Sequence, residues 1–484
     1  MDIFSVFFWG LTATCVVWCW VNRALLFPSA GQGGDTVDGL SLQRLKAFRV
    51  NYLLVFFLAM AGDWLQGPAT YPMYRAHGYK TDAIGVFFVV GFLSGAASGP
   101  FVGTLVDRFG RKRGAIMLCV TYSLCSILIQ YDSLPLLILG RFFGGVSTSL
   151  LHTAFEAWLT YEHFHRGFPS PALSTTFALS SLGNSVVAIG MGLVSDKVTY
   201  WRGDPDDPER GAPFWVAVLA FASCAGVVWS SWTENYGSGG GGVAQVGGGG
   251  SVQKFKDALR TVAADKAILA TGLIQVLFET CMYVFVFLWT PVLETLTENG
   301  HVPYGLVFAC FMISVMIGSV LFRWMIDRGW TGKEMAQLQM TVASASMVAL
   351  VVTTNVAVVF ASFILFEMCC GIHFPLSGTL RSRYVPEDSR ATIMALFRMP
   401  MNVMVAASVL AIRSVSPTTL FAVCAVCVIT ARFVAVDMFL PVTVLSGGGQ
   451  GSSETAPAPG EDELGLPVKE DAGLMVEVKV EERS

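Results

Sequence analysis

The sequence predicts an all-α membrane protein made of two six-helix bundles, with one extra transmembrane helix at the N-terminus. Of its 484 residues, 54% are hydrophobic and only 14% are charged, whereas about a quarter of the residues in a soluble domain are charged. The chain contains repeated apolar runs of the roughly 20 residues that a membrane-spanning helix needs. A short cationic turn that follows an Asp-Arg pair also occurs twice, at residues 103–113 and, in degenerate form, at residues 325–333. Such internal duplication is typical of membrane proteins built from two related halves.

Thirteen apolar runs account for the predicted spans. In chain order they cover residues 3–27, 48–72, 82–106, 114–132, 135–162, 171–199, 212–233, 265–293, 304–327, 334–353, 356–380, 390–412 and 417–441. The first run could alternatively be a cleaved signal peptide. Because Met1-Asp2-Ile3 lacks the positive n-region of such a peptide and the apolar stretch is long, we predict a retained helix.

These spans divide the chain into five regions. Residues 1–47 hold the N-terminal transmembrane helix and a cytosolic loop, residues 48–234 the N-terminal six-helix bundle, and residues 265–445 the C-terminal six-helix bundle. Between the bundles, residues 235–264 form a Gly-rich cytosolic linker, and its stretch 237–251 is expected to be a flexible tether, whether natural or engineered. Residues 446–484 are rich in Gly, Pro, Glu and Asp, which predicts a disordered acidic cytosolic tail, either simply solvated or bound to a partner.

The basic residues of the loops fall on one side of the membrane. One set of loops contains Arg44, Lys46, Arg49, Arg108, Arg111, Lys112, Arg113, Lys254, Lys256, Arg260, Arg381, Arg383 and Arg390. The alternate set holds little beyond Arg75, Lys80, Arg202, Arg210 and Arg413. The positive-inside rule places the first set in the cytosol. We therefore expect a multi-pass protein of the plasma membrane with its N-terminus outside and its C-terminus in the cytosol.

Composition excludes several other classes of function. The net charge is −4 and the basic residues form no patch, so nucleic acid is not an expected partner. The eleven cysteines lie mostly inside apolar runs, which indicates buried free thiols rather than metal ligands. The His163 and His165 pair fits surface residues, and no Gly-rich phosphate loop opens a soluble domain. We therefore expect a monomer that is not an enzyme and carries no metal or cofactor.

Ionisable residues inside the apolar runs are the candidate functional groups, because each is costly in hydrocarbon unless it faces a cavity or a partner. Counted from residue 48, they fall on core helices 1 (Asp63), 4 (Arg141 and Glu156), 7 (Glu279), 10 (Glu367 and His373) and 11 (Arg398). Helices 1, 4, 7 and 10 are equivalent members of three-helix units, and in transporters with nested inverted repeats they face a central cavity. The acids and the histidine are therefore predicted to act as coupling or ion-pairing groups around one shared cavity.

Each of these groups also has a structural interpretation. Asp63 and Arg141 can form an ion pair between helices 1 and 4, and Glu156 can brace the cationic turn on the cytosolic side. His373 can be a hydrogen-bonded packing histidine. Arg398 precedes Met399-Pro400, where a broken helix exposes carbonyls, so substrate contact and structural pairing fit it equally.

The two cationic turns are predicted to control conformation rather than to bind substrate, because their basic residues can anchor to lipid phosphates and an aspartate there can cap a helix. The predicted gating residues are Asp107, Arg108, Arg111, Lys112 and Arg113 in the first copy, and Asp327 and Arg328 in the second.

Several segments resemble a known family. The turn at 103–113 resembles the helix 2–3 signature of the major facilitator superfamily, and residues 140–145 (GRFFGG) resemble its helix-4 arginine motif. More specifically, segments of the transport core resemble the molybdate-anion transporter branch of that superfamily. They are residues 61–68, 121–125, 154–158, 274–279, 287–293, 371–375 and 397–400. The second turn departs from the signature because it lacks the Gly-Arg-Lys-Arg run, so gating there can differ.

This resemblance implies a secondary transporter that takes up molybdate, a tetrahedral dianion. Such a dianion needs cationic or hydrogen-bonding donors, and Arg141 and Arg398 are the deepest arginines, with guanidinium forks that match paired oxyanion oxygens. Neutral groups that could also contact substrate are Gln66, Gln275, Asn184, Asn402, Tyr71 and Thr290. The four acids suit an anion site only if they pair with the arginines or carry protons, which would allow proton symport.

Two other functions fit the same sequence. A proton-coupled transporter of another solute, such as an organic anion, a drug or a sugar, could use the same buried charges. A non-transporting membrane scaffold could act through the tail or through the helix at 3–27.

Overall fold

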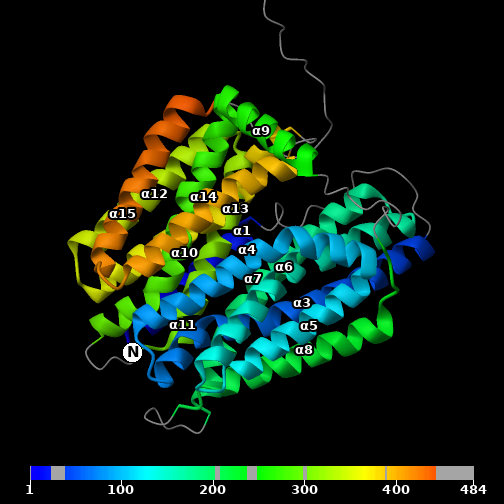
Figure 1. Ribbon diagram of the computed structural model, residues 1–484, viewed down its shortest axis with the longest axis horizontal. Helices are drawn as coiled ribbons and strands as arrows, with labels where there is room; N and C mark the ends of the chain where they lie inside the picture. Colours follow the sequence, from blue (N-terminus) through cyan, green and yellow to red (C-terminus); the bar gives the residue numbers. More distant parts are fainter. Residues whose placement is uncertain are drawn as a thin grey trace, which may run out of the picture. The chain divides into compact units, whose positions relative to one another are not determined.

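The computed structural model describes residues 2–22, 39–201, 208–236, 248–297, 302–386 and 390–442. All regular elements in this part of the chain are helical (Figure 1). In chain order they are α1 (Ile3–Val21), α3 (Gly39–Ala76), α4 (Thr81–Phe109), α5 (Arg111–Leu128), α6 (Leu134–His165), α7 (Ser170–Thr199), α8 (Ala212–Ser231), α9 (Gly248–Ala264), α10 (Lys266–Leu296), α11 (Tyr304–Asp327), α12 (Gly332–Val352), α13 (Val356–Tyr384), α14 (Arg390–Ala411), α15 (Pro417–Thr430) and the π-helical segment η2 (Ala431–Phe439).

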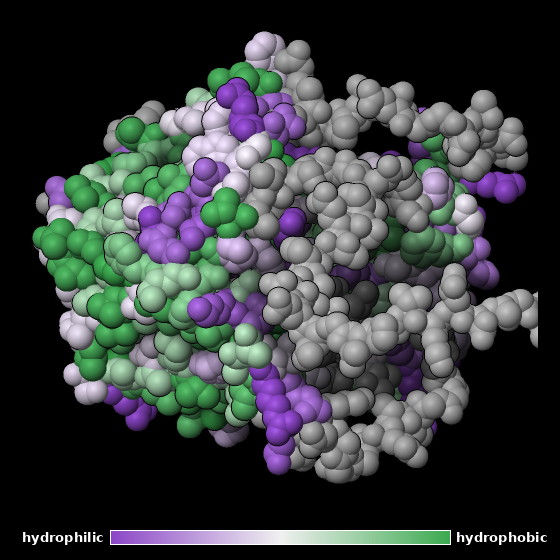
Figure 2. Space-filling model, turned by 90° about the horizontal axis from the view of Figure 1, so that it is seen from above, coloured by the Kyte–Doolittle hydropathy of each residue, from purple (hydrophilic) through white to green (hydrophobic). Residues whose placement is uncertain are grey.

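The helices form the two predicted bundles. Helices α3 to α8 pack together as the N bundle, and α10 to η2 pack together as the C bundle. In Figure 1 the N bundle lies to the lower right in blue to green, and the C bundle to the upper left in green to orange. Hydrophobic residues cover much of the side formed by the C bundle in Figure 2, as a lipid-facing surface requires.

Twelve helices in the described residues are long and apolar enough to span a membrane. The predicted span at 114–132 falls in the remaining long helix, α5. Its 18 residues begin with Arg111, Lys112 and Arg113, and these charges leave too short an apolar stretch to meet the same criterion. Helix α5 nevertheless packs between α6 and α8 as a full member of the N bundle.

The extra N-terminal helix is confirmed, and it packs on the C bundle rather than on the bundle that follows it in sequence. The ring of Phe4 lies 5.0 Å from that of Phe360 on α13, and the ring of Trp18 lies 6.1 Å from that of Trp324 on α11. The opposite side of α1 exposes Trp9, Val16 and Trp20. A helix with one packed side and one exposed apolar side suits the bundle–lipid boundary.

The linker is partly helical, which corrects the prediction of a flexible tether up to residue 251. Residues 237–247 lie outside the described residues, and α9 begins at Gly248. Apolar residues recur at three- and four-residue intervals in α9, so Ala258 and Val262 are buried while Leu259 and Arg260 are exposed. The predicted tail at 446–484 also lies outside the described residues.

Equivalent helix pairs in the two bundles approach each other closely at glycine residues. A Cβ on Gly145 of α6 would overlap backbone atoms of Gly91 on α4, and a Cβ on Gly371 of α13 would overlap the carbonyl of Val315 on α11. Small residues of this kind let membrane helices approach closely. The pairs α4–α6 and α11–α13 occupy equivalent places in the duplicated sequence, so the packing repeats together with the sequence.

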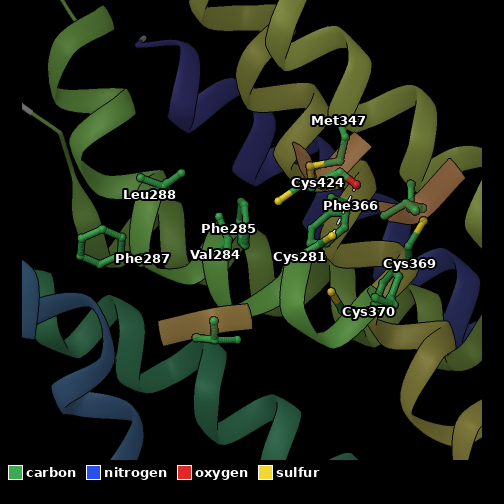
Figure 3. Packing of buried hydrophobic residues seen from close by; sticks show 14 of the residues in the cluster. Cys281, Val284, Phe285, Phe287, Leu288, Met347, Phe366, Cys369, Cys370 and Cys424 are labelled. Atoms are coloured by element: carbon green, nitrogen blue, oxygen red, sulfur yellow. Dashed lines mark hydrogen bonds between the residues drawn. The ribbon is translucent and has the colours of Figure 1, made fainter. Parts of the chain in front are cut away.

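Buried aromatic residues and thiols fill the C bundle. Figure 3 shows Phe285 and Phe366 beside Cys281 and Cys424, with the Cys281 thiol donating to the Cys424 carbonyl oxygen at 3.5 Å. All eleven cysteines are free, and most are buried. The interpretation of the cysteines as apolar packing groups is therefore confirmed.

Candidate functional site

The two bundles are joined at one end, where α3, α7, α10 and α14 end and α4, α8, α11 and α15 begin. We call it the outer end, after the side on which the loop charges predict it, and the opposite end the cytosolic end. There Asp196 of α7 caps α11 of the other bundle. The backbone N–H groups of Gly305 and Leu306 donate to its two carboxylate oxygens at 2.8 and 2.9 Å. Because the first N–H groups of a helix lack partners in the helix itself, this carboxylate supplies what α11 needs.

Ion pairs flank this cap. Arg75 lies 4.0 Å from Glu294 and Asp82 lies 3.4 Å from Arg413, and each pair joins the two bundles. The Tyr304 hydroxyl donates to Glu294 at 2.6 Å. These groups are charged or polar and lie at the ends of apolar helices, which is where such groups are tolerated at a membrane surface.

An aromatic layer lies below these polar contacts. The ring of Phe287 on α10 lies 6.4 Å from that of Tyr71 and 5.5 Å from that of Phe88, and the rings of Phe92 and Tyr283 are 4.9 Å apart. These hydrogen bonds, ion pairs and ring contacts between the two bundles lie in the outer half of the helices. The outer end is therefore closed.

A cleft opens in the cytosolic half. Its volume is about 620 Å³, and it is lined by Arg111 of α5 and by Thr153, Glu156, Ala157, Thr160, Tyr161, Phe164 and His165 of α6. Glu156 is exposed to this cleft, and Arg111 of the first cationic turn lines the same wall. All of these lining residues belong to the N bundle, so this cleft lies in its cytosolic half, away from the closed outer end.

The predicted charges of the N bundle meet around Tyr122. Its hydroxyl donates to Asp63 at 2.7 Å and lies 3.1 Å from the Thr148 hydroxyl. Arg141 lies within electrostatic reach of the same hydroxyl, with its guanidinium 5.3 Å from the Phe88 ring and its buried Nε without a hydrogen-bond partner. Asp63 and Arg141 therefore lie near the same hydroxyl, whereas Glu156 lies apart from them on the cytosolic cleft.

The neutral candidates are divided between the closed and open regions. Gln66 is buried and donates to the carbonyl of Gly62 at 3.1 Å, Thr290 is 2% exposed, and the Tyr71 hydroxyl lies 2.9 Å from that of Thr81. In this state the structure does not bring these three to the cleft, because each is packed in the outer half. Asn184 is half-buried and accepts from the Trp64 indole at 2.8 Å.

The C bundle gathers three predicted residues into one chain of polar contacts. The Gln275 amide donates to Glu279 at 3.4 Å, and Nε2 of His373 lies 3.6 Å from the other oxygen of Glu279. Gln339 lies 3.1 Å from Nδ1 of His373. Since an amide nitrogen can only donate, Nδ1 accepts and the ring proton of a neutral His373 is on Nε2, toward Glu279.

The remaining C-bundle candidates differ in exposure. Glu367 is 6% exposed beside the thiol of Cys370, so it lies inside the bundle rather than on the cleft. Arg398 is exposed, and Asn402 follows it one turn later on α14.

Sequence reasoning missed two residues of this region. Apart from its position near a helix end, nothing in the sequence marks Asp196 as a capping residue. Arg381 was counted as a loop charge, because the span was predicted to end at residue 380. Helix α13 instead continues to Tyr384, and half-buried Arg381 turns back to donate to Gln275 at 3.3 Å and to Ser377 at 3.1 Å.

Comparison with known proteins gives the family. A family model described as sugar transporters with 12 transmembrane segments matches residues 3–373. A molybdate-anion transporter of Takifugu rubripes is 32% identical over 430 residues, covering 81% of this chain and 88% of that protein. One of Danio rerio is 32% identical and covers 83% and 86%. The chain belongs to the molybdate-anion transporter family of the major facilitator superfamily. It is accordingly a multi-pass membrane transporter and not an enzyme.

Solved structures show the same superfamily fold. A mutant of the nucleoside transporter NupG superposes with a TM-score of 0.64 at 11% identity, covering 81% of this chain and 100% of that one. A D-xylose-proton symporter superposes with a TM-score of 0.61 at 11% identity, covering 82% and 97%.

In this member of the family, the first cationic turn is held by a residue that the sequence did not single out. Glu234, which follows α8, accepts from the backbone N–H groups of Lys112 at 2.8 Å and Arg113 at 3.3 Å, and so caps α5. Asp107 instead pairs with Arg111 at 2.8 Å. The expectation that Asp107 would cap a neighbouring helix is therefore replaced by a cap from Glu234. Arg108 extends over the ring of Phe109 at 5.5 Å.

The second cationic turn is capped and tied to its bundle by a different set of residues. Thr331 and Glu334 form a capping box at the start of α12, and Lys333 donates to the Asp437 carbonyl oxygen at 2.9 Å. Asp327 and Arg328 are exposed, with the Arg328 guanidinium 4.7 Å from the Trp324 ring. Lys112 similarly donates to the Trp229 carbonyl oxygen at 2.8 Å, so each turn is tied to the last helix of its own bundle.

Proposed function

We propose that this protein takes up molybdate by alternating access, and that the state described here is open to the cytosol. The observation that carries the proposal is the asymmetry between the two ends. Contacts between the bundles, led by the Asp196 cap, lie in the outer half, whereas a cleft lined by N-bundle residues beside Glu156 opens in the cytosolic half. Release into the cytosol requires this arrangement, and uptake requires the reverse one.

The substrate is proposed from the relatives and from the charges. The relatives above are named molybdate-anion transporters, and a tetrahedral dianion suits arginine forks. Arg141 has an unsatisfied buried Nε in the N bundle, and Arg398 is exposed in the C bundle. A site between two bundles that draws a cation from each would bind the anion most tightly when both approach it.

Proton coupling is proposed through the contact between Glu279 and His373. In this proposal Glu279 accepts the coupled proton, and His373 holds its Nε2 proton toward that carboxylate. A protonated Glu279 would lower the repulsion that an entering dianion meets. In this proposal the protein acts as a monomer in the plasma membrane, with its N-terminus outside and its C-terminus in the cytosol.

An uptake assay tests the proposal. Cells that lack endogenous molybdate import and express this protein are given nanomolar labelled molybdate, with sulfate, tungstate or organic solutes as competitors. We expect molybdate accumulation that tungstate suppresses and organic solutes do not. Absence of molybdate uptake, with uptake of an organic solute instead, would contradict the proposal.

For the coupling step, uptake is measured against external pH in Glu279→Gln and Glu367→Gln variants. Unchanged rates and unchanged pH dependence in both would exclude proton coupling through these acids.

A further inference from the structure

We infer that Arg381 and Arg398 together form the oxyanion-binding site in the wall of the C bundle, with Gln275 and Ser377 positioning Arg381. This inference rests on the proposed function and names the residues that would hold its substrate. Arg381 is not part of the membrane-surface charge that the sequence suggested. It lies in the last turn of α13, half-buried, and is directed back along the helix.

The position of the Arg381 guanidinium is fixed by two neutral groups. Its Nη1 donates to Oε1 of Gln275 on α10 at 3.3 Å and to the Ser377 hydroxyl at 3.1 Å. Both contacts use the same nitrogen, so the rest of the planar fork stays available for a ligand. A guanidinium whose orientation is already fixed loses less entropy on binding an oxyanion.

Arg398 brings a second positive charge close to the first. Helix α13, which carries Arg381, and helix α14, which carries Arg398, both pack against α10. The electrostatic environment of Arg381 contains Arg398 as a like charge and Glu279 as an opposite charge. Gln275 is nine residues into α10 and Arg398 is eight residues into α14. With a rise of about 1.5 Å per residue, both lie about 12–14 Å from the cytosolic end of their helices.

The carboxylate nearest to this pair does not neutralise it by direct contact. Within the residues that the structure describes, neither Arg381 nor Arg398 forms an ion pair. Instead, Gln275 bridges Glu279 and Arg381. Its amide nitrogen donates to Glu279, and its carbonyl oxygen accepts from Arg381. Two cations held near each other without a direct counter-ion repel each other, and a dianion that contacts both would relieve this repulsion.

This pair of arginines favours one chemical class of ligand. Two guanidinium groups offer paired N–H donors that match the edges of a tetrahedral oxyanion, and a double negative charge matches two cations better than a single charge does. Molybdate, tungstate and sulfate belong to this class, whereas neutral sugars and organic cations do not.

Substitutions of three arginines, two on α13 and one on α14, test the inference. Labelled molybdate uptake is measured for Arg381→Gln, Arg381→Lys and Arg398→Gln, with Arg383→Gln as the matched control, because Arg383 is exposed two residues further along α13. We expect Arg381→Gln and Arg398→Gln to raise the apparent KM for molybdate at least tenfold. Arg381→Lys, which keeps the charge but loses the fork, should raise it several-fold, and Arg383→Gln should stay within twofold of the wild type.

Binding to purified protein separates this inference from the proposed function. Molybdate-dependent thermal stabilisation is measured in detergent for each variant that elutes as a single folded species; if Arg381→Gln does not fold, Arg381→Lys decides. A wild-type protein that neither binds nor transports a tetrahedral oxyanion would overturn the proposed function. A wild-type protein that transports molybdate, while Arg381→Lys and every folded glutamine variant match Arg383→Gln, would overturn only the assignment of the two arginines.

Discussion

The Asp196 cap makes a quantitative prediction about the closed outer end. Asp196→Ala removes two hydrogen bonds, at 2.8 and 2.9 Å, from the N–H groups of Gly305 and Leu306. Loss of an N-cap side chain costs about 1 kcal/mol, and loss of a negative charge at a helix N-terminus costs about 0.3–2 kcal/mol. The outer-closed state should therefore lose about 1–3 kcal/mol relative to the outer-open state, which shifts their equilibrium by about 5–150-fold.

Hydrogen–deuterium exchange of the protein in nanodiscs measures this shift. In Asp196→Ala, peptides that contain Gly305 and Leu306 should exchange faster than in the wild type. Asp196→Asn keeps an acceptor but loses the charge, so it should give an intermediate effect. Asp132→Ala is the control, because Asp132 is exposed in the turn between α5 and α6 of the N bundle. Equal exchange at residues 305 and 306 in wild type and Asp196→Ala, or the same acceleration in Asp132→Ala, would refute the reasoning.

Three further predictions concern stability and the state of His373. Glu234→Gln should lower the thermal unfolding midpoint, because the cap of α5 loses its charge at a cost of about 0.3–2 kcal/mol; a midpoint equal to the wild type would contradict this. Gly371→Val should lower folded yield and midpoint strongly, because even a Cβ there overlaps the Val315 carbonyl, whereas Gly226→Ala, with open space around it, should not. Gln339→Leu should change the pH profile of uptake, since it removes the group that fixes the tautomer of His373; an unchanged profile would separate His373 from coupling.

The fold was predictable because lipid imposes simple rules on sequence. Spanning helices need long apolar runs, so each of the thirteen predicted runs contains a helix in the described residues, and the duplicated turn marked the two halves. The error in the linker occurred because these rules do not apply outside the membrane-spanning runs. The predicted flexible tether was extended past the start of α9, because the glycines at 248–250 hid the beginning of an amphipathic helix.

The site was only partly predictable, because a pattern of polar residues does not reveal which face of a helix they occupy. Asp63, Glu279 and His373 stood out because charge inside an apolar run is costly, and the structure joins the last two. Gln66 and Thr290 stood out equally but are packed in the outer half. Arg381 was overlooked because, three residues from a helix end, it had the same surroundings in sequence as a surface charge.

The two cationic turns also show why a repeated sequence need not mean a repeated function. In the N bundle, the carboxylate that caps α5 comes from Glu234, beyond α8, in the segment that leads into the linker between the bundles. In the C bundle, the capping box at α12 is formed by Thr331 and Glu334 of the same helix end. A displacement of the linker can therefore uncap α5, whereas it leaves the α12 cap unchanged. In the alternating-access cycle proposed above the bundles move relative to each other, and of these two turns the first would respond to that motion through its cap.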